Sequence, residues 1–465
     1  MECMDELKRN TLDNPPAFKK LLGPSFILLG LGLGSGELIL WPFLTSNYGL
    51  GIIWGAVIGI TFQFFINMEI SRYSLVNGES IFVGYARKLK YLPVWFLLST
   101  FLPWIWPGII ASSAKVITTV LNVGTVAQVA IIELIAIGLL LSLGPTLYKT
   151  VEKFQKILIG FGVPIIALLA LYIASATDFL SLAKGVIGVG NNYMFLPEGI
   201  SIATFLAAFA YSGAGGNLNL AQSFYIKEKE YGMGKYSGKI SSLITGKSHE
   251  SSITGSTYED TPENRSKMKN WWNKINMEHF VVFWLTGAIT ILLLALLSYS
   301  TTYGLKSNIT GINFVISEAA VIGSRTFEFF GVLFLILVGL MLFGTQLTVL
   351  DATSRILTEN VLILRSKLKT LSTSKMYYLL LWFQIISGIT VFMLGFTEPL
   401  QLLIISAVLN AFAMFVHACL TLWVNTTLLN KSIKPSMFRI SMLVLAICFY
   451  GGFSLYILLN YLKVV

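Results

Sequence analysis

Charged side chains are scarce in this sequence of 465 residues, where they make up only 12%. Soluble proteins carry about 25% charged residues, and these residues form much of the polar shell that keeps a protein in water. Hydrophobic residues reach 55%, and the mean hydropathy is +0.73. This balance excludes an ordinary soluble enzyme and a disordered chain, and it indicates a protein that crosses the membrane several times.

Cysteine and histidine are also rare, with three of each. The cysteines are Cys3, Cys419 and Cys448, which show neither CxxC spacing nor a disulfide framework. The histidines are far apart in the sequence, and this spacing argues against a structural zinc site. The sequence shows no nucleophile–base set, metal triad or phosphate loop, so we expect neither an enzyme nor a resident cofactor.

Eleven continuous apolar runs are long enough to cross a bilayer, which takes about 20 residues per helix. Their continuity excludes the alternating segments of a membrane β-barrel. The predicted spans are 21–45, 49–70, 92–118, 125–143, 155–175, 201–222, 279–299, 329–350, 377–397, 400–425 and 438–462. The sequence therefore predicts an all-α, multi-pass protein of the cell membrane.

The net charge of +10 reflects 33 Lys and Arg against 23 Asp and Glu. Nucleic-acid binding is one explanation of a basic chain, but membrane proteins collect Lys and Arg in their cytoplasmic loops. With the tail of residues 1–20 in the cytoplasm, 28 basic residues fall on the inner side and five on the outer side. We therefore expect no nucleic-acid partner, a cytoplasmic N-terminus and, after eleven spans, an extracytoplasmic C-terminus.

Two glycine-rich stretches interrupt the predicted spans 1 and 6, at Leu29–Glu37 and at Tyr211–Asn219. Each glycine weakens a helix by about 1 kcal/mol relative to alanine. An unwound backbone inside a membrane is tolerated where it lines a cavity, whereas small residues alone are typical of close helix packing. Because each stretch opens a set of five spans, we expect both helices to be broken.

The two sets of five spans cover residues 21–175 and 201–427, with a polar cytoplasmic loop over 223–276. Since five is odd, the second set is inserted upside down relative to the first. This is the inverted-repeat plan of many secondary transporters, which hold the substrate where two broken helices meet. Span 11, residues 438–462, is an addition outside the repeat.

Glu37 lies well inside span 1, beside the first glycine-rich stretch. An acidic group at such depth costs about 2.5–3.5 kcal/mol on insertion scales and is usually functional. Asn217 and Asn219 would add oxygen ligands, so a metal ion is expected at Glu37 and Asn217. The candidate substrate-binding residues are Gly34, Ser35, Gly36, Glu37, Gly213, Gly215, Gly216, Asn217 and Asn219.

Polar residues near the inner half of span 8 have two interpretations. Thr345, Gln346 and Thr348 are candidates to hold a coupling ion against span 1, or their hydroxyls bond to their own helix backbone. Acid–base pairs at helical spacing also predict ion pairs at the inner ends of spans 2 and 8. These pairs are Glu69 with Arg72 and Asp351 with Arg355.

Three stretches are similar to motifs of one known family. Gly23-Pro24 resembles the Gly-Pro that opens the family's first helix. Arg72–Ser80 (RYSLVNGES) resembles the stretch after its second helix, and Tyr148–Lys153 (YKTVEK) resembles the start of its fifth helix. The family is that of the NRAMP divalent-metal transporters, and the resemblance covers most of the chain. It implies the LeuT-type fold, with five plus five spans and one extra helix, and transport by alternating access.

The sequence departs from this family where the substrate is bound. Where the family has Asp-Pro-Gly-Asn, this chain has Gly34–Glu37 (GSGE), and where the family has Met-Pro-His, it has Gly215–Asn217 (GGN). The acidic residues of the family's span 3 are replaced by Trp104–Pro107. Without the methionine sulfur, only oxygen ligands remain, and these suit Mg, Ca and Mn better than softer metals. The expected function is transport of a divalent cation through a hard-ligand site.

Two other interpretations remain open. The Gly-Ser-Gly of residues 34–36 also resembles that of amino-acid transporters with the same fold, in which backbone amides hold the substrate carboxylate. The chain would then be an ion-coupled transporter of a small amino acid or carboxylate. A receptor-like or scaffolding protein is a third interpretation, supported only by the loop 223–276. The expected partners are the lipid bilayer and the transported cation or organic molecule, and the oligomeric state, a monomer included, is open.

If the cargo is a metal ion, the lack of a sulfur ligand predicts weak discrimination against Mg²⁺ or Ca²⁺. Competition binding on the purified protein measures this directly, with Cd²⁺ as the soft competitor. A strong preference for Cd²⁺ over Ca²⁺ would contradict the hard-ligand site.

Overall fold

The computed structural model describes residues 6–143, 147–237, 253–305, 311–365 and 372–463. Within these ranges the chain is almost entirely helical, apart from two short strands, β1 (Lys8–Arg9) and β2 (Ser256–Thr257), which pair in parallel. The predicted all-α class is therefore confirmed.

Ten helical segments of the described residues are long and apolar enough to cross a membrane. They comprise α2 (Pro24–Gly32), η1 (Leu33–Leu40) and α3 (Trp41–Tyr48); η2 (Leu50–Ile52) and α4 (Trp54–Asn77); α6 (Leu92–Trp104) and α7 (Gly108–Leu121); α8 (Val126–Leu143); α9 (Leu147–Ile173); α13 (Pro262–His279), η5 (Phe280–Leu285) and α14 (Thr286–Thr302); α16 (Glu328–Leu364); α17 (Thr373–Met393); α18 (Pro399–Thr427); and α19 (Met437–Tyr461). Each of them matches one predicted span.

The remaining predicted span, span 6 over residues 201–222, is a broken helix. Its first half, α11 (Ile202–Ala210), stops at Tyr211, and the chain becomes helical again in η3 (Gly216–Ala221) and α12 (Gln222–Glu228). Each half is too short to cross a membrane alone. Gly213, Gly215 and Gly216 all have positive φ angles, which glycine adopts without a steric penalty. The glycines thus break this helix, as the sequence predicts.

The predicted break in span 1 is wrong. The helix is continuous from Pro24 to Tyr48, and its central part, η1, is a π-helix with wider turns. A Cβ atom on Gly36 would lie 1.7 Å from the Tyr211 carbonyl oxygen, and one on Gly32 would lie 2.4 Å from the Gly213 carbonyl oxygen. These glycines therefore let span 1 touch the break of span 6, which is the close-packing role of small residues.

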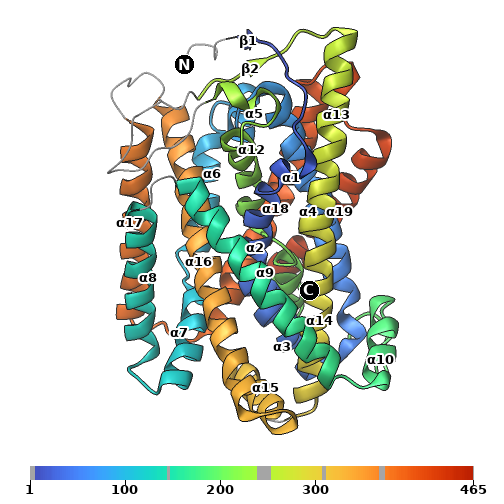
Figure 1. Cartoon of the computed structure of the whole chain (residues 1–465), viewed down its shortest axis with the longest axis vertical. Coiled ribbons are helices and arrows are strands. Elements are labelled where there is room, and N and C mark those ends of the chain that lie inside the picture. Colours follow the sequence, from blue (N-terminus) through green and yellow to red (C-terminus); the bar gives the residue numbers. More distant parts are fainter. Residues whose placement is uncertain (1–5, 144–146, 238–252, 306–310, 366–371, 464–465) are drawn as a thin grey trace.

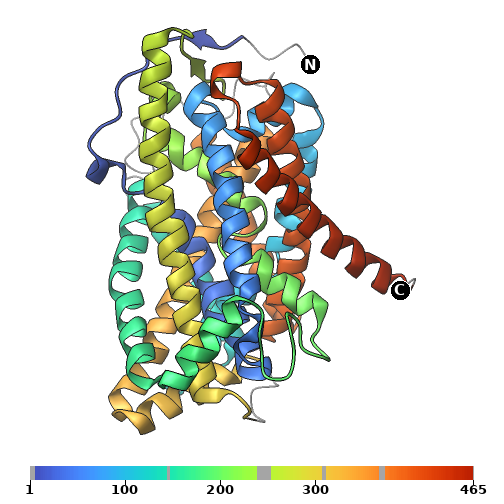
Figure 2. The ribbon, with the colours of Figure 1, turned by 90° about the vertical axis from the view of Figure 1, so that its right-hand side faces the viewer.

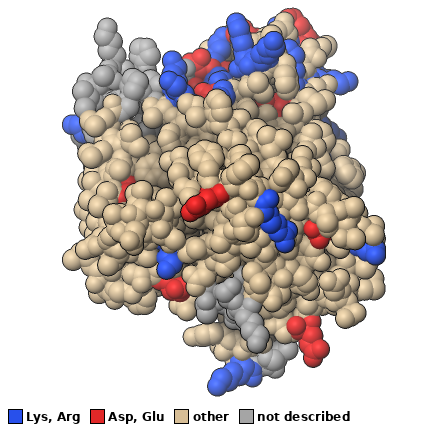
Figure 3. Space-filling model, turned by 60° about the horizontal axis from the view of Figure 1, so that its bottom comes forward, with Lys and Arg blue, Asp and Glu red and all other residues tan. Residues whose placement is uncertain are grey.

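The long helices run side by side along the long axis of the molecule (Figure 1). One end carries the N-terminus, both strands and the start of α13, and the opposite end carries the short helices α10 (Ala176–Val186) and α15 (Asn313–Arg325). The last helix, α19, diverges from the bundle toward the C-terminus (Figure 2) and is mostly exposed. In Figure 3, which brings the end with α10 and α15 forward, charged side chains are few and scattered over most of the view and gather toward the opposite end.

The described parts of the expected loop, residues 223–237 and 253–276, are largely helical. Its beginning belongs to α12, and η4 (Gly232–Tyr236) follows. Its end belongs to α13, which begins where the Thr261 hydroxyl accepts from the Asn264 N–H and Pro262 occupies the first turn. Residues 238–252 of this loop lie outside the described residues.

Gly36→Ala should strongly destabilise the protein, because the new methyl group would overlap the Tyr211 carbonyl of a packed neighbour. Overpacking of this kind costs about 1–3 kcal/mol or more. Thermal unfolding of the purified protein in detergent measures the effect. Gly160→Ala in α9 is the matched control, since a Cβ there meets no atom within 4 Å; equal melting temperatures for the two variants would contradict the close contact.

Candidate functional site

A side-chain amide bridges the break in span 6. Gln63 of α4 donates from Nε2 to the Ala210 carbonyl oxygen at 2.9 Å, and its Oε1 accepts from the Gly215 N–H at 3.1 Å. It replaces part of the hydrogen bonding that the broken helix has lost, where no lipid group can do so. Gln63 was not predicted from the sequence, although an amide inside an apolar span is itself a signal of function.

A second polar group holds the opposite side of the break. Asn410 of α18 donates from Nδ2 to the Tyr211 hydroxyl at 2.9 Å, and that hydroxyl lies 2.7 Å from Ser406 Oγ. The ring of Trp104 stacks on Tyr211 with the centroids 5.7 Å apart. A Cβ on Gly216 would lie 1.9 Å from Asn410 Oδ1, so glycine is required there for space as well as for its backbone conformation.

Glu37 is fully buried, and neither carboxylate oxygen has a hydrogen-bond partner among the described residues. Its surroundings are apolar: a Cβ on Gly287 of α14 would lie 3.6 Å from Glu37 Oε1 and 2.6 Å from the end of Ile60 in α4. An ionised carboxylate without a partner is very costly at such a place. Glu37 therefore has to be neutralised, either by a proton or by a cation.

Glu37 also lies close to the break of span 6. A Cβ on Gly213 would contact Gln63 of α4 at 2.6 Å and Phe283 at 2.9 Å. Phe283 lies four residues before Gly287, whose Cβ would be 3.6 Å from Glu37 Oε1. Gly36, the residue before Glu37, lies against the Tyr211 carbonyl at the edge of the break, so Glu37 follows directly on a residue that touches the break.

Asn217 and Asn219, the other expected ligands, lie in η3. Asn217 donates from Nδ2 to Ser99 Oγ at 2.8 Å and to Thr100 Oγ1 at 3.0 Å, both in α6. Its Oδ1 atom and both polar atoms of Asn219 are buried without a partner in the described part of the chain. Glu37 and Asn217 therefore face different helices, and within the described ranges no three His, Cys, Asp or Glu side chains form a metal cluster.

Two of the three candidates for a coupling ion in span 8, Thr345 and Thr348, donate to backbone carbonyls. Thr345 donates to the Gly30 carbonyl oxygen at 2.8 Å, and a Cβ on Gly34 would lie 2.6 Å from the Thr345 hydroxyl oxygen. Thr348 donates to Gly344 of its own helix at 2.8 Å. Gln346 is buried in the same helix, and the nearby Ser35 hydroxyl is buried without a partner in the described structure. Thr345 therefore ties span 8 to span 1.

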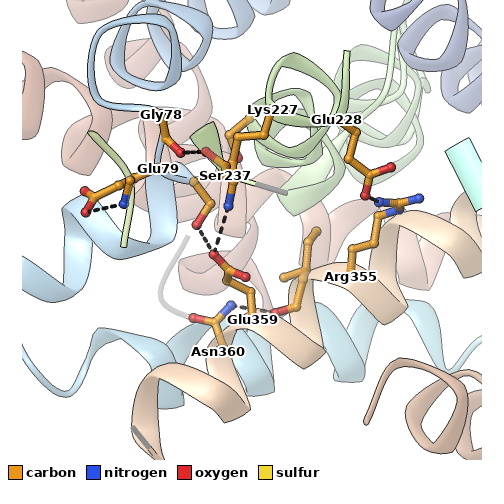
Figure 4. A network of polar contacts seen from close by, with 12 residues as sticks. Gly78, Glu79, Lys227, Glu228, Ser237, Arg355, Glu359 and Asn360 are labelled. Atoms are coloured by element: carbon orange, nitrogen blue, oxygen red, sulfur yellow. Dashed lines mark hydrogen bonds and ion pairs between the residues drawn. The ribbon is translucent and has the colours of Figure 1, made fainter. Parts of the chain in front are cut away.

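Three consecutive charged residues fasten the second half of span 6 at the end of the molecule that carries the N-terminus, and Figure 4 shows two of them, Lys227 and Glu228, with Glu359 and Arg355. The ion pairs are Lys227 with Glu359 of α16 at 3.8 Å, Glu228 with Arg355 of α16, and Lys229 with Glu152 of α9 at 2.8 Å. Each of these pairs joins α12 to a neighbouring helix. They close the bundle between the break and this end.

Arg355 is the centre of this closure and is fully buried. It pairs with Asp351 at 2.9 Å, as the sequence predicts, and Tyr377 donates a further hydrogen bond to Asp351. The predicted pair of Glu69 and Arg72 is also confirmed, at 2.7 Å. The spacing within one helix made both pairs predictable, whereas Glu228 comes from a different helix and was missed.

The chain has the LeuT fold, which is a transporter fold and not that of an enzyme: its described residues form ten membrane-length helices around a broken sixth span. No protein-family model and no curated relative matches the sequence. The fold therefore rests on likeness to solved structures.

A mutant of the manganese transporter of Eremococcus coleocola has a similar structure, with a TM-score of 0.65 at 13% identity, over 97% of this chain and 90% of that chain. The same transporter in complex with an aromatic bis-isothiourea substituted compound gives a TM-score of 0.66 with the same identity and coverage. MhsT in complex with L-phenylalanine gives 0.50 at 14% identity, over 94% of this chain and 97% of that chain. At these identities the likeness shows the LeuT fold, and the NRAMP resemblance is supported at the level of fold.

Arg355→Gln should destabilise the protein by about 3–5 kcal/mol, since it leaves the buried Asp351 and Glu228 carboxylates without their cation. Thermal unfolding measures the loss, and adding Glu228→Gln to the same variant should restore part of it by removing one uncompensated charge. Arg265→Gln, at an exposed pair with Asp260, is the control and should barely change the melting temperature. An equal effect of the two single variants would show that the buried network does not hold α12 in place.

Proposed function

We propose that this protein is a secondary transporter that carries a divalent metal cation across the membrane by alternating access. The observation that carries the proposal is Glu37, a fully buried carboxylate without a hydrogen-bond partner in the described structure, which follows the Gly36 that lies against the break of span 6. A cation neutralises such a group, and so does a proton once the cation has left.

Close packing favours an ion over an organic substrate. In the amino-acid interpretation, a substrate carboxylate would lie between spans 1 and 6, at the amides of residues 34–36. Here a single added carbon atom on Gly32 or Gly36 would overlap the backbone of residues 211–213, so the space between the two spans is too small for an amino acid. Span 1 is also continuous, and it therefore has no free helix end whose amides could bind a carboxylate at that point. A cation needs far less room than an amino acid.

The proposed ligands are oxygen atoms. We propose that Glu37 supplies the negative charge and that the amide oxygens of Asn217 and Asn219 complete the shell together with backbone carbonyls near the break. Such sets suit Ca²⁺ or Mn²⁺, and Mg²⁺ would keep several waters. Because Glu37 and Asn217 face different helices in this conformation, the complete shell requires a shift of η3 relative to span 1.

We also propose that the end with the N-terminus faces the cytoplasm and that residues 21–175 and 201–427 are the two inverted repeats. The surplus of Lys and Arg on the predicted inner side supports this orientation. The paired acids and bases at the N-terminal end would then form the cytoplasmic closure of the transport path.

Glu37→Gln tests the proposed cation site, because it keeps the shape of the side chain and removes its charge. We expect divalent-cation binding and uptake to fall by about tenfold or more, since the loss of one charge-assisted contact costs on the order of 1.5–3 kcal/mol. The measurement is isothermal titration of the purified protein with Mn²⁺, Ca²⁺ and Mg²⁺, together with uptake into proteoliposomes.

Glu133→Gln is the matched control, since Glu133 is a buried carboxylate that accepts from Ser113 Oγ at 2.6 Å, in α8 rather than beside the break. It should leave cation binding unchanged. The same titrations with a panel of amino and carboxylic acids test the other interpretation. Binding of an organic acid that survives Glu37→Gln, with no binding of divalent cations to the wild type, would overturn the metal proposal.

A further inference from the structure

A basic pocket of about 260 Å³ lies at the N-terminal end, away from the break of span 6. It is enclosed by α4, α13 and the connection between α18 and α19. Four of its ten lining residues are Lys or Arg, and none is acidic. The basic residues are Arg72, Arg265, Lys269 and Lys434.

The two arginines are held in fixed positions. Glu69 accepts from Arg72 at 2.7 and 2.9 Å, and Arg72 also donates to the Ile433 carbonyl oxygen at 3.2 Å. Asp260 accepts from Arg265 at 2.7 and 2.9 Å. Arg72 thus joins α4 to the connection between α18 and α19, and Ser432 of that connection donates to Asp260, just before α13, at 3.2 Å. These contacts set the shape of the pocket before any ligand arrives.

The two lysines differ from the arginines because they are exposed and have no ion-pair partner among the residues that the structure describes. Lys269 belongs to α13, and Lys434 belongs to the connection before α19. Two free ammonium groups on opposite walls are available for an anion, whereas the arginine charges are already balanced in part.

The pocket continues into an apolar, exposed helix face. The Trp272 ring lies between Arg72, 3.8 Å from its centroid, and Arg439 at 4.8 Å. Arg439 also lies 5.5 Å from the ring of Phe65, which packs against Phe438 with the centroids 5.5 Å apart. Phe438 is 65% exposed and opens α19, a membrane-length helix.

We propose that this pocket binds the phosphate of an anionic phospholipid. Lys269 and Lys434 would bind the phosphate oxygens, and Trp272 would form the wall at the level of the headgroup, where its amphipathic ring is favoured. The acyl chains would lie along Phe438 and the start of α19. Basic pockets between membrane helices recognise lipid headgroups in this way, and the adjoining apolar face distinguishes a lipid from a free phosphate ion.

Such a lipid would bridge α13 to the connection that leads into α19. The site lies outside the proposed transport path and includes none of its ligands. Its existence therefore does not depend on the identity of the transported substrate.

The test is native mass spectrometry of the full-length protein in detergent, titrated with phosphatidylglycerol, phosphatidylcholine or inorganic phosphate. Lys269→Gln combined with Lys434→Gln should weaken phosphatidylglycerol binding by about tenfold or more, since each lysine near an anionic lipid contributes about 1 kcal/mol. The matched control removes two exposed lysines of α9 at the same end, Lys149→Gln and Lys153→Gln, and should leave the affinity unchanged.

Three results would overturn the proposal. An equal loss in the α9 control would mean that binding follows the total charge rather than this pocket. Equal affinity for phosphatidylcholine would exclude selection of an anionic lipid. Displacement of phosphatidylglycerol by an equal concentration of inorganic phosphate would show a site for the free ion.

Discussion

The lost backbone hydrogen bonds of span 6 are the constraint on which the centre of the structure depends. In a bilayer such groups have no water to bind and must be satisfied by the protein. Gln63 binds to both sides of the break, and Asn410 fixes Tyr211 at its edge. The glycines of span 1 allow its backbone to lie directly against this region, so the arrangement of four helices follows from one interrupted helix.

Charge is used in two opposite ways in the bundle. At the N-terminal end, buried acids and bases are paired across helices, as with Arg355, Asp351 and Glu228, and these pairs hold elements together. In the centre, Glu37 has no partner in the described structure. A buried, ionised carboxylate without a partner raises the free energy of this conformation, and a transported or coupling ion bound to it would remove that cost.

Local patterns made much of the fold predictable. The apolar runs predicted the spans, the glycine-rich stretch of span 6 predicted its break, and the spacing of Asp351 and Arg355 within one helix predicted their pair. The π-helix of span 1 was not predictable, because a glycine that unwinds a helix and a glycine that packs closely look alike in the sequence. The distinction depends on Tyr211, which is far along the chain from Gly36, just as Gln63 is far from the backbone groups that it binds.

The π-helical part of span 1 has a mechanical consequence. A π-helix accommodates one residue more than the α-helix on either side of it, so η1 stores a small excess of chain within a continuous span. If η1 became α-helical, the residues after it would rotate by about 100° about the helix axis relative to those before it. Glu37 lies inside η1, so the same change would turn its carboxylate by part of that angle. Span 1 could in this way change its contacts without unwinding, which would preserve its backbone hydrogen bonds in the middle of the membrane.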